Sequence, residues 1–488
     1  MQENLLRVLI KGGVLSPSEM KQIIELAEQM GLKTLHFGSR QDIIFPNVTN
    51  LADYQHVFPS LTMEYVADRQ YQNIVSSYVS ADIFPATSWL GGATYLNILE
   101  SFDYEPKLEI NIVDSLQQLV PLFTGQINFI ASEEEDYWYV YLRLPHWDSI
   151  QLYPVLIYTW DIAKVAEVIE QAYKDVSNAE ELFEEINHEI DTNNRTISKA
   201  LNVSFNVFPY YEGMNKMSID RYWLGLYWRN NQYDLRFLKA MCDLCLESRI
   251  GKICLTPWKS LIVKGIPAQD KLAWEKLLGR FGINVRHSSL ELNWHLPVAD
   301  EDALELKRYI VRNFDQNDIS TYGLTFGVKS HYGLNFTSIV VEKNPVPSIV
   351  QAYDIRPTYN VLYGEKFNPN LRKYITYAQD VDKIELPGLL MELSQLYFEQ
   401  LGENDVVEDE SKSLEPSKPD EGVEILNVWQ CRACLTIYDS RYGDPRQGIE
   451  PGRLFEGLAA DYCCPVCSAP KTSFVRHEGG TEEVFVSS

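Results

Sequence analysis

Four of the eight cysteines in the chain are spaced so that they can bind one metal ion. Cys431 and Cys434 form one Cys-x2-Cys pair, and Cys464 and Cys467 form a second pair after an interval of 29 residues. Two such pairs can present four thiolates at the corners of a tetrahedron, a geometry that zinc and iron both accept. In a cytosolic chain, such pairs are more often metal ligands than disulfides. The spacing predicts a four-sulfur metal site and leaves the metal open.

The residues around these cysteines resemble the rubredoxins, a family of one-iron electron carriers. The resemblance covers about residues 428–475 and includes the stretches VWQCRAC, IYDSRYGDP, GIEPGRLFEGL, ADYCCPVC and KTSF. It implies one iron ion that changes its oxidation state by one electron, with structural zinc as the alternative. Four thiolates leave no coordination position for a substrate, so the site is expected to relay electrons. The residues that match the aromatic core of this family are Trp429, Tyr438, Phe455, Tyr462 and Phe474.

The resemblance also distinguishes the neighbours Cys463 and Cys464. In the family's Cys-Pro-x-Cys pattern the proline follows a ligand, and here Pro465 follows Cys464. Cys464 and Cys467 are therefore the implied ligands, and Cys463 falls on a variable position. Its thiol either faces away from the metal as a small apolar side chain or is exposed and open to oxidation or ligand exchange.

Two positions depart from the family, and a group of acids surrounds the site. Rubredoxins usually have glycine after the second cysteine of each pair, where the chain often takes a positive φ. This chain has Leu435 and Ser468 there, and Leu435 would be strained in that conformation. Nearby acids either steer a basic partner or form an ordinary solvated surface. They are Asp439, Asp444, Glu450, Glu456 and Asp461.

The N-terminal part of the chain begins with a helix and a hairpin. Ser16, Pro17 and Glu19 have the types and spacing of an N-cap, a first helical residue and the acid of a capping box. Gly31 supplies a helix stop. The stretch 33–46 then has the pattern of a strand, a turn and a strand.

The same order returns about 200 residues later. A helix with one apolar face is expected in 231–251, and a hairpin with a Thr-Pro turn in 252–266. Each unit is followed by a mixed segment that closes with a helix, in 159–176 and in 386–401. This duplication predicts two half-bodies related by a pseudo-twofold axis.

The duplicated part resembles the nitrite and sulfite reductases, in which a ferredoxin-like half-domain precedes a larger α/β segment and the pair occurs twice. Residues 12–45 and 248–266 resemble the two ferredoxin-like halves, and 107–132 and 353–367 resemble parts of the larger segments. The implied fold class is α+β: duplicated ferredoxin-like, nitrite/sulfite-reductase-like halves plus a small rubredoxin-like metal-binding domain.

The cofactor ligands of that family are missing. Its enzymes hold a 4Fe–4S cluster through four cysteines, one of which also attaches sirohaem. The matching segments here, 73–84, 114–117 and 340–348, contain no cysteine. Ser or Asp oxygen replaces thiolate poorly on such a cluster. We therefore expect no 4Fe–4S cluster and no sirohaem in the body.

The arginines with which the family binds anions are also largely replaced. His36 and Cys254 occupy two of those positions, while Arg40, Gln41 and Lys259 match the ends of the two hairpins. The last three either bind a carboxylate or small anion, or are structural polar groups.

No catalytic residue is predicted from the rest of the body. Cys242 and Cys245 lie one helical turn apart and, with Cys254, are expected to pack in the core; the alternative is that the three thiols bind zinc or a cluster, although no fourth ligand is evident. The remaining histidines, His295 among them, show no ligand spacing and receive no role.

Composition limits the partners and divides the chain. The formal net charge of −25 disfavours nucleic acid and anionic lipid. No long apolar run and no signal-peptide pattern occurs, so a cytoplasmic protein is expected. The acidic stretch near residue 402 reads as a flexible tether. The expected domains are 1–175 and 216–401 for the two repeats, 176–215 for a connector, 402–423 for the tether and 424–488 for the rubredoxin domain.

The sequence therefore predicts a one-electron carrier that serves assimilatory nitrite or sulfite reduction, its body a cofactor-free docking scaffold. Its expected partners are redox proteins, a reductase as donor and a terminal reductase as acceptor. Two alternatives stay open. One is a divergent sirohaem-type reductase with a fused rubredoxin donor, and the other is a zinc-stabilised protein-binding module.

Overall fold

The computed structural model divides the chain into two compact units, Met1–Val406 and Val407–Ser488. We call the first unit the body, and residues 428–476 of the second the C-terminal module. The structure describes 5–48, 51, 54, 56–205, 207–283, 291–330, 335–345, 356–410, 428–432, 436–440, 443–444, 447–450 and 452–476, without the side chains of 330, 402–410 and 428.

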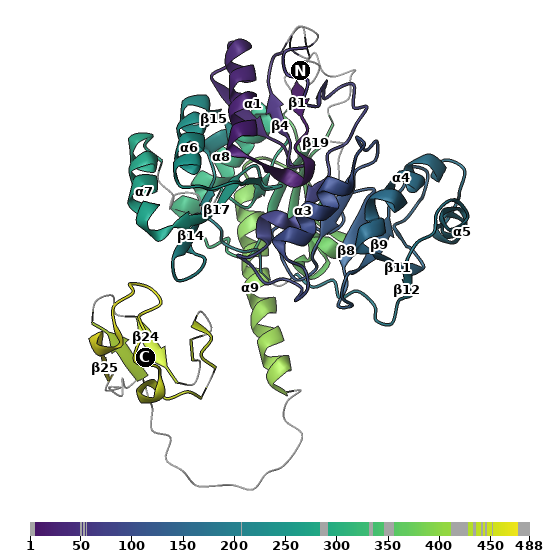
Figure 1. The fold of residues 1–488 in the computed structure, drawn as a ribbon. Coiled ribbons are helices and arrows are strands. Elements are labelled where there is room, and N and C mark those ends of the chain that lie inside the picture. The colour runs from purple at the N-terminus through teal and green to yellow at the C-terminus, as the bar shows by residue number, and fades with distance from the viewer. Residues whose placement is uncertain are drawn as a thin grey trace. The chain divides into compact units, whose positions relative to one another are not determined.

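Two five-stranded sheets in the body correspond in four of their five strands; β15, β4 and β1 of one sheet and β14 and β17 of the other are labelled in Figure 1. Each joins four strands of one repeat to a fifth strand from the other repeat, and the sheets differ in one edge strand: β5 follows its hairpin in the chain, whereas β13 precedes its hairpin. The first sheet comprises β15 (Tyr233–Asp234), β3 (Thr34–Phe37), β4 (Ile43–Phe45), β1 (Leu6–Val8) and β5 (Met63–Tyr65). The second comprises β2 (Val14–Leu15), β16 (Ile253–Leu255), β17 (Leu261–Pro267), β14 (Arg221–Leu226) and β13 (Gly213–Lys216).

The two repeats therefore exchange a strand. β15 of the second repeat pairs with β3 of the first, and β2 of the first repeat pairs with β16 of the second. Asn231 strengthens this exchange, because its side chain both accepts from the backbone N–H of Phe37 and donates to the Phe37 carbonyl. The duplication expected from the sequence is confirmed in its topology.

Two further sheets complete the repeats and share a pattern of two parallel pairings followed by antiparallel ones. The first has seven strands, β6 (Val75–Ser76), β7 (Ile110–Val113), β8 (Ile127–Ala131), β9 (Tyr137–Leu142), β10 (Gln151–Leu152), β11 (Val155–Tyr158) and β12 (Asn194–Thr196). The second has five, β18 (Trp294–His295), β19 (Phe326–Ser330), β20 (Ile339–Lys343), β21 (Tyr359–Gly364) and β22 (Tyr374–Val381).

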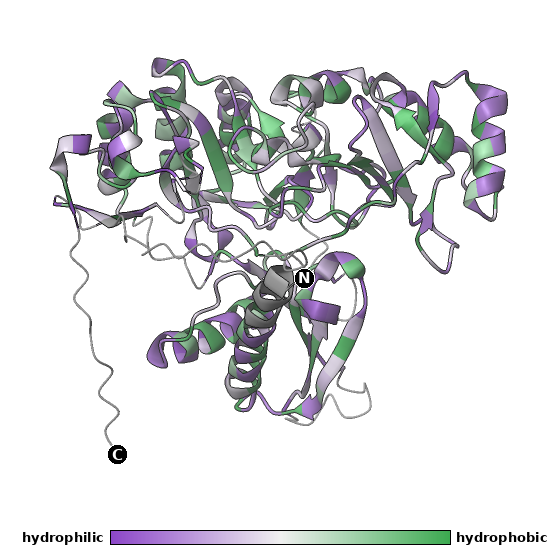
Figure 2. Cartoon of the chain, turned by 90° about the horizontal axis from the view of Figure 1, so that it is seen from below, coloured by the Kyte–Doolittle hydropathy of each residue, from purple (hydrophilic) through white to green (hydrophobic). Residues whose placement is uncertain are grey.

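Helices cover these sheets with one apolar face. In Figure 2 the inner strands are largely green, while the outer helices carry both colours along their length. The helices of the first repeat are α1 (Pro17–Gln29), α3 (Gly92–Ser101), α4 (Ile162–Ala172) and α5 (Ala179–Glu189). Those of the second are α6 (Leu235–Glu247), α7 (Lys271–Arg280), α8 (Glu301–Gln316) and α9 (Leu386–Glu410). None of the helices in the described ranges is long and apolar enough to cross a lipid bilayer.

Helix α1 begins as the sequence predicts. The Ser16 side chain accepts from the backbone N–H of Glu19, and the Glu19 carboxylate accepts from the backbone N–H of Ser16. Gly31 follows the helix with φ +73°, a conformation that costs glycine little.

Two expected connecting segments contain regular structure. The expected connector 176–215 contains α5 and β12, and β12 extends the seven-stranded sheet by pairing with β11. The tether expected from residue 402 is helical at its start, because α9 continues to Glu410. Residues 411–423 lie outside the described part of the chain.

The C-terminal module has a three-stranded antiparallel sheet. Strand β23 (Val428–Cys431) lies between β24 (Ile437–Asp439) and β25 (Phe474–Arg476). The buried residues of its own small core are Cys431, Tyr438, Phe455, Leu458, Tyr462, Cys464 and Phe474.

Candidate metal centre

Three of the four predicted ligands converge in the C-terminal module. The Sγ atoms of Cys431, Cys464 and Cys467 all lie within 4.8 Å of one another, and those of Cys431 and Cys467 are 3.6 Å apart. Cys431 and Cys464 are buried, whereas Cys467 is exposed. Cys434, the fourth predicted ligand, lies outside the described residues. The three thiols fit one side of a tetrahedral four-sulfur site.

Backbone turns hold the two cysteine pairs in place. Cys431 ends β23, and its N–H donates to the Thr436 carbonyl at 2.8 Å, which closes the first turn. In the second pair the Ser468 N–H donates to the Cys464 carbonyl at 2.9 Å. Ser468 has φ +60°, as expected for a position where rubredoxins have glycine. Leu435, the other departure, lies outside the described residues.

The five aromatic residues singled out in the sequence form one cluster beside the sulfurs. The Phe455 ring is central: it stacks on Trp429 at 4.6 Å and meets Tyr462 edge-on at 5.8 Å. Tyr438 and Phe474 complete the group at 5.4 and 5.0 Å from Phe455. Aromatic packing of this density excludes water from the buried side of the site.

Cys463 lies outside the group of three sulfurs. It is half-buried, and its Sγ is 4.0 Å from Gln447 Oε1. The Gln447 amide also donates to the Cys463 carbonyl and to Asp444. The position agrees with a side chain that turns away from the metal.

One acid assigned to the surface is part of the core instead. Asp444 is buried, and its Oδ2 accepts from the Tyr462 hydroxyl at 3.2 Å. Burial beside Asp444 raises the pKa of Tyr462. Glu450, Glu456 and Asp461 are exposed, so the possible docking rim excludes Asp444. The sequence missed this because a buried Asp and an exposed one look alike without their neighbours.

In the body, two segments that resemble cluster-binding loops do come together. Ser77 Oγ accepts from the Asp114 N–H at 2.8 Å, and Ser80 Oγ donates to Gln117 Oε1 at 3.1 Å. All four residues are buried. Asp114 further accepts from both the N–H and the hydroxyl of Thr87. A closed hydrogen-bond network therefore fills this place in the first repeat.

The cysteines of the body do not form a four-thiolate set. The body contains only Cys242, Cys245 and Cys254. The first two are buried in the core under α1 and α6, and Cys254 belongs to a different apolar cluster. Burial raises the pKa of Cys242 to about 12 and also raises those of the other two. The residues present do not fit a four-cysteine iron–sulfur cluster, and core packing is the role the structure gives them.

The two hairpin turns, 38–42 and 256–260, have the same backbone. In each, the first residue of the turn donates to the carbonyl of the last, and Gln41 and Lys259 have φ +58° and +59°. The side chains differ. Gln41 is buried and donates to carbonyls of both repeats, Ser76 and Leu255, so its role is structural.

Arg40 and Lys259 instead line a pocket of about 540 Å³ in the body. Asp42 and His295 line it too, although the sequence gave neither a role. No spacing signal connects these residues, because they meet only when both repeats fold together.

Together, the module and the body define a small thiolate metal centre joined to a duplicated α/β unit. Family models match in two places: "Rubredoxin" at residues 428–474 and "Nitrite/Sulfite reductase ferredoxin-like half domain" at residues 2–50. Rubredoxin-1 of Chlorobaculum tepidum is 37% identical over 65 residues, which are 13% of this chain and 88% of that protein. The chain therefore belongs, in its C-terminal part, to the rubredoxin family.

One further relative and one solved structure match different shares of this chain. Rubredoxin-2 of Alcanivorax borkumensis is 48% identical over 50 residues, 10% of this chain, and the match spans only 29% of that relative. The solved structure of the Mycobacterium tuberculosis NirA protein superimposes with a TM-score of 0.60 at 12% identity, covering 79% of each chain. At that identity the likeness shows the fold of the body.

Proposed function

We propose that this protein transfers single electrons through one rubredoxin-type iron ion held by Cys431, Cys434, Cys464 and Cys467. The observation that supports it best is the convergence of three of these thiols within 4.8 Å, inside a segment that belongs to the rubredoxins. Four thiolates close the coordination sphere. The centre then exchanges electrons and binds no substrate.

The proposed step needs no bond to form or break. A donor reduces Fe3+ to Fe2+, and an acceptor oxidises it again, one electron at a time. The exposed side of the centre, where Cys467 is exposed and Val466 is 62% exposed, is the side on which we place both partners.

The body serves, in this proposal, as a docking scaffold without a redox cofactor. Its three cysteines cannot supply four thiolates, and a polar network occupies one place where the first repeat resembles a cluster-binding loop. The match to a nitrite/sulfite reductase half domain favours assimilatory nitrite or sulfite reduction in the cytoplasm as the setting. The partners would then be a reductase that donates and a terminal reductase that accepts.

The experiment is an absorption spectrum combined with metal analysis of the full-length protein, purified without added metal. We expect about one iron per chain and thiolate-to-iron bands that bleach on reduction. Zinc without colour, even after growth with excess iron, would contradict electron transfer and support the binding-module alternative. Tetrapyrrole bands, or iron well above one per chain, would support the fused-reductase alternative.

A further inference from the structure

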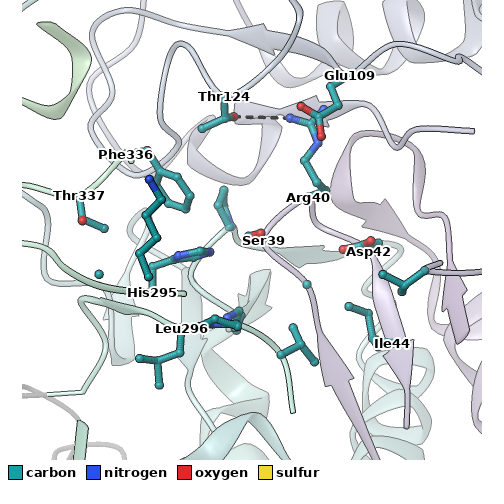
Figure 3. A pocket seen from close by; sticks show the side chains of 18 of the residues that line it. Ser39, Arg40, Asp42, Ile44, Glu109, Thr124, His295, Leu296, Phe336 and Thr337 are labelled. Atoms are coloured by element: carbon teal, nitrogen blue, oxygen red, sulfur yellow. Dashed lines mark hydrogen bonds between the residues drawn. The ribbon is translucent and has the colours of Figure 1, made fainter. Parts of the chain in front are cut away.

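The pocket in the body is built from both repeats and has walls of two kinds. Figure 3 shows Arg40, Asp42 and Ile44 on one side and His295, Leu296 and Phe336 on the side facing them. Arg40 and Asp42 lie in the turn between β3 and β4, and Ile44 lies in β4. His295 ends β18, Leu296 follows it, and Phe336 lies in the segment before β20. The volume of about 540 Å³ lies within the range of roughly 300–1,000 Å³ that is usual for small-molecule sites.

The lining is strongly basic in a chain that is acidic as a whole. Six Arg and Lys residues line the pocket against two acids, while the chain carries a net charge of −25. The two acids are Asp42 and Glu109. The six basic residues are Arg7, Arg40, Arg69, Arg143, Lys259 and Lys329.

Three of the six basic residues have an acidic partner beside them. Arg7 pairs with Glu64, Arg143 with Glu109 at 3.6 Å, and Lys329 with Glu342 at 3.8 Å. The others, Arg40, Arg69 and Lys259, make no ion pair among the described residues. Burial raises the pKa of Asp42, and Arg7, Arg40 and Arg69 oppose that rise, so several guanidinium groups share this one acid. The pocket therefore keeps excess positive charge.

Lys259 is the clearest case of an unmatched cation. Its residue is 5% exposed and lines the pocket. Its ammonium group makes no hydrogen bond or ion pair within the described ranges, and it is not among their fully buried polar atoms, so it reaches the open space of the pocket. Burial lowers its pKa to about 7, with Lys307 adding to the effect and Asp42 opposing it. A buried amine without a partner costs stability, and such a cost is expected where a ligand supplies the partner.

Other polar atoms of the lining are also without partners. Asp42 Oδ1, Arg40 Nε and Arg143 Nε are buried and lack a hydrogen bond among the described residues. The terminal nitrogens of Arg40, in contrast, are fixed by Asn111 and by backbone carbonyls, so its guanidinium is held in position. The guanidinium is therefore fixed at the pocket wall, where its positive charge attracts an anion.

The rest of the wall is apolar, which limits the kind of anion. An inorganic oxyanion would leave most of the volume and the Leu296, Val328 and Phe336 side chains unused. We propose that this pocket binds a compact organic anion that carries at least two carboxylates on an apolar body, with Arg40 and Lys259 facing its carboxylates. The site is separate from the metal centre and from the proposed electron transfer.

Three metal-free probes test this by isothermal titration calorimetry on the full-length protein. Benzene-1,3,5-tricarboxylate and citrate have similar charge but differ in their apolar body, and sulfate is the inorganic control. We expect the aromatic tricarboxylate to bind at least tenfold more tightly than citrate, and sulfate to bind most weakly. Equal binding of all three, or none, overturns the proposal. Uroporphyrin binding more tightly than the tricarboxylate would overturn the compact ligand and identify a tetrapyrrole site.

Matched lysine variants separate the pocket from the fold. Lys259→Met should weaken the tricarboxylate about ten- to hundredfold, the usual value of a charge-assisted bond. It should also raise the melting temperature of the free protein, because it removes an unpaired buried amine. Lys264→Met removes another largely buried lysine, one that donates to Tyr78 and Ala81 and does not line the pocket. It should leave binding unchanged. Unchanged binding in Lys259→Met overturns the proposal. If that variant does not fold, Lys329→Met, at another lysine of the lining, repeats the binding test, and unchanged binding there overturns the proposal.

Discussion

At the residue scale, the adjacent cysteines Cys463 and Cys464 differ in role: Cys464 is a predicted metal ligand and Cys463 is not. Cys464 is 1% exposed and faces Cys431 and Cys467, while Cys463 turns toward Gln447. Both have the same chemistry, so the backbone direction alone assigns their roles.

This assignment predicts opposite results for two serine variants. Cys464→Ser should lower the metal content well below one ion per chain and abolish the thiolate absorption, because serine oxygen replaces thiolate poorly. Cys463→Ser should keep both. Metal analysis and absorption spectra of the two purified variants provide the comparison, and loss of metal in Cys463→Ser would contradict the assignment.

A buried histidine in the body predicts a dependence on pH. Burial, and secondarily the nearby Lys259, lower the pKa of His36 to about 4 from an ordinary value of 6.5. The unfolded chain therefore takes up a proton before the folded one does. The contribution of neutral His36 to the free energy of unfolding is fully present above pH 6.5. It is lost as the pH falls toward 4, and the loss is at most about 3 kcal/mol.

Urea unfolding at pH 7 and pH 5 measures this effect. His36→Gln should show a smaller loss of stability between the two pH values than the parent protein. His188→Gln, at an exposed position on α5, is the control and should behave like the parent. An unchanged loss in His36→Gln would rule out His36 as its source.

At the element scale, short signals begin and end the helices, and the exchanged strands join the two repeats. The capping box of α1 was readable from Ser16 and Glu19 alone, because its partners lie three residues apart. The pairing of β15 with β3 was not, since it joins residues about 200 positions apart.

The cap predicts a local stability change. Ser16→Ala should destabilise the body by about 1 kcal/mol, because the N–H of Glu19 loses its acceptor. Ser18→Ala makes the same substitution at an exposed position two residues later, where alanine favours the helix, and should be neutral or slightly stabilising. Chemical denaturation of both variants gives the difference; equal effects would mean that the cap contributes nothing.

At the scale of the whole molecule, two units differ greatly in how they are stabilised. Among the described residues, the body has three apolar clusters, whereas the buried core of the C-terminal module has seven residues, two of them cysteines. Such a small core rarely supplies more than about 3–5 kcal/mol. We therefore expect a bound metal to supply much of the module's stability.

Removing the metal should therefore affect one unit only. In calorimetry of the full-length protein we expect two transitions, of which only the smaller shifts or disappears after reduction and chelation. Cys464→Ser should reproduce the metal-free trace without chelator. A large downward shift of the main transition would show that the body depends on the metal too.

The sequence by itself determined the features that depend on near neighbours or on a strict pattern. The Cys-x2-Cys pairs, the aromatic residues that surround them, the α1 cap and the order of elements in each repeat are of this kind. They are set by local backbone geometry and by ligand spacing, which the chain carries in its linear order.

Only the tertiary structure decided which distant side chains meet. It placed Asp444 in a core, made Gln41 a structural link and brought Arg40 and Lys259 to one pocket. Each of these depends on burial and on partners from another element. The role of a carboxylate, an amide or an amine depends on the charges and the solvent around it. The linear sequence does not show which distant residues provide that environment.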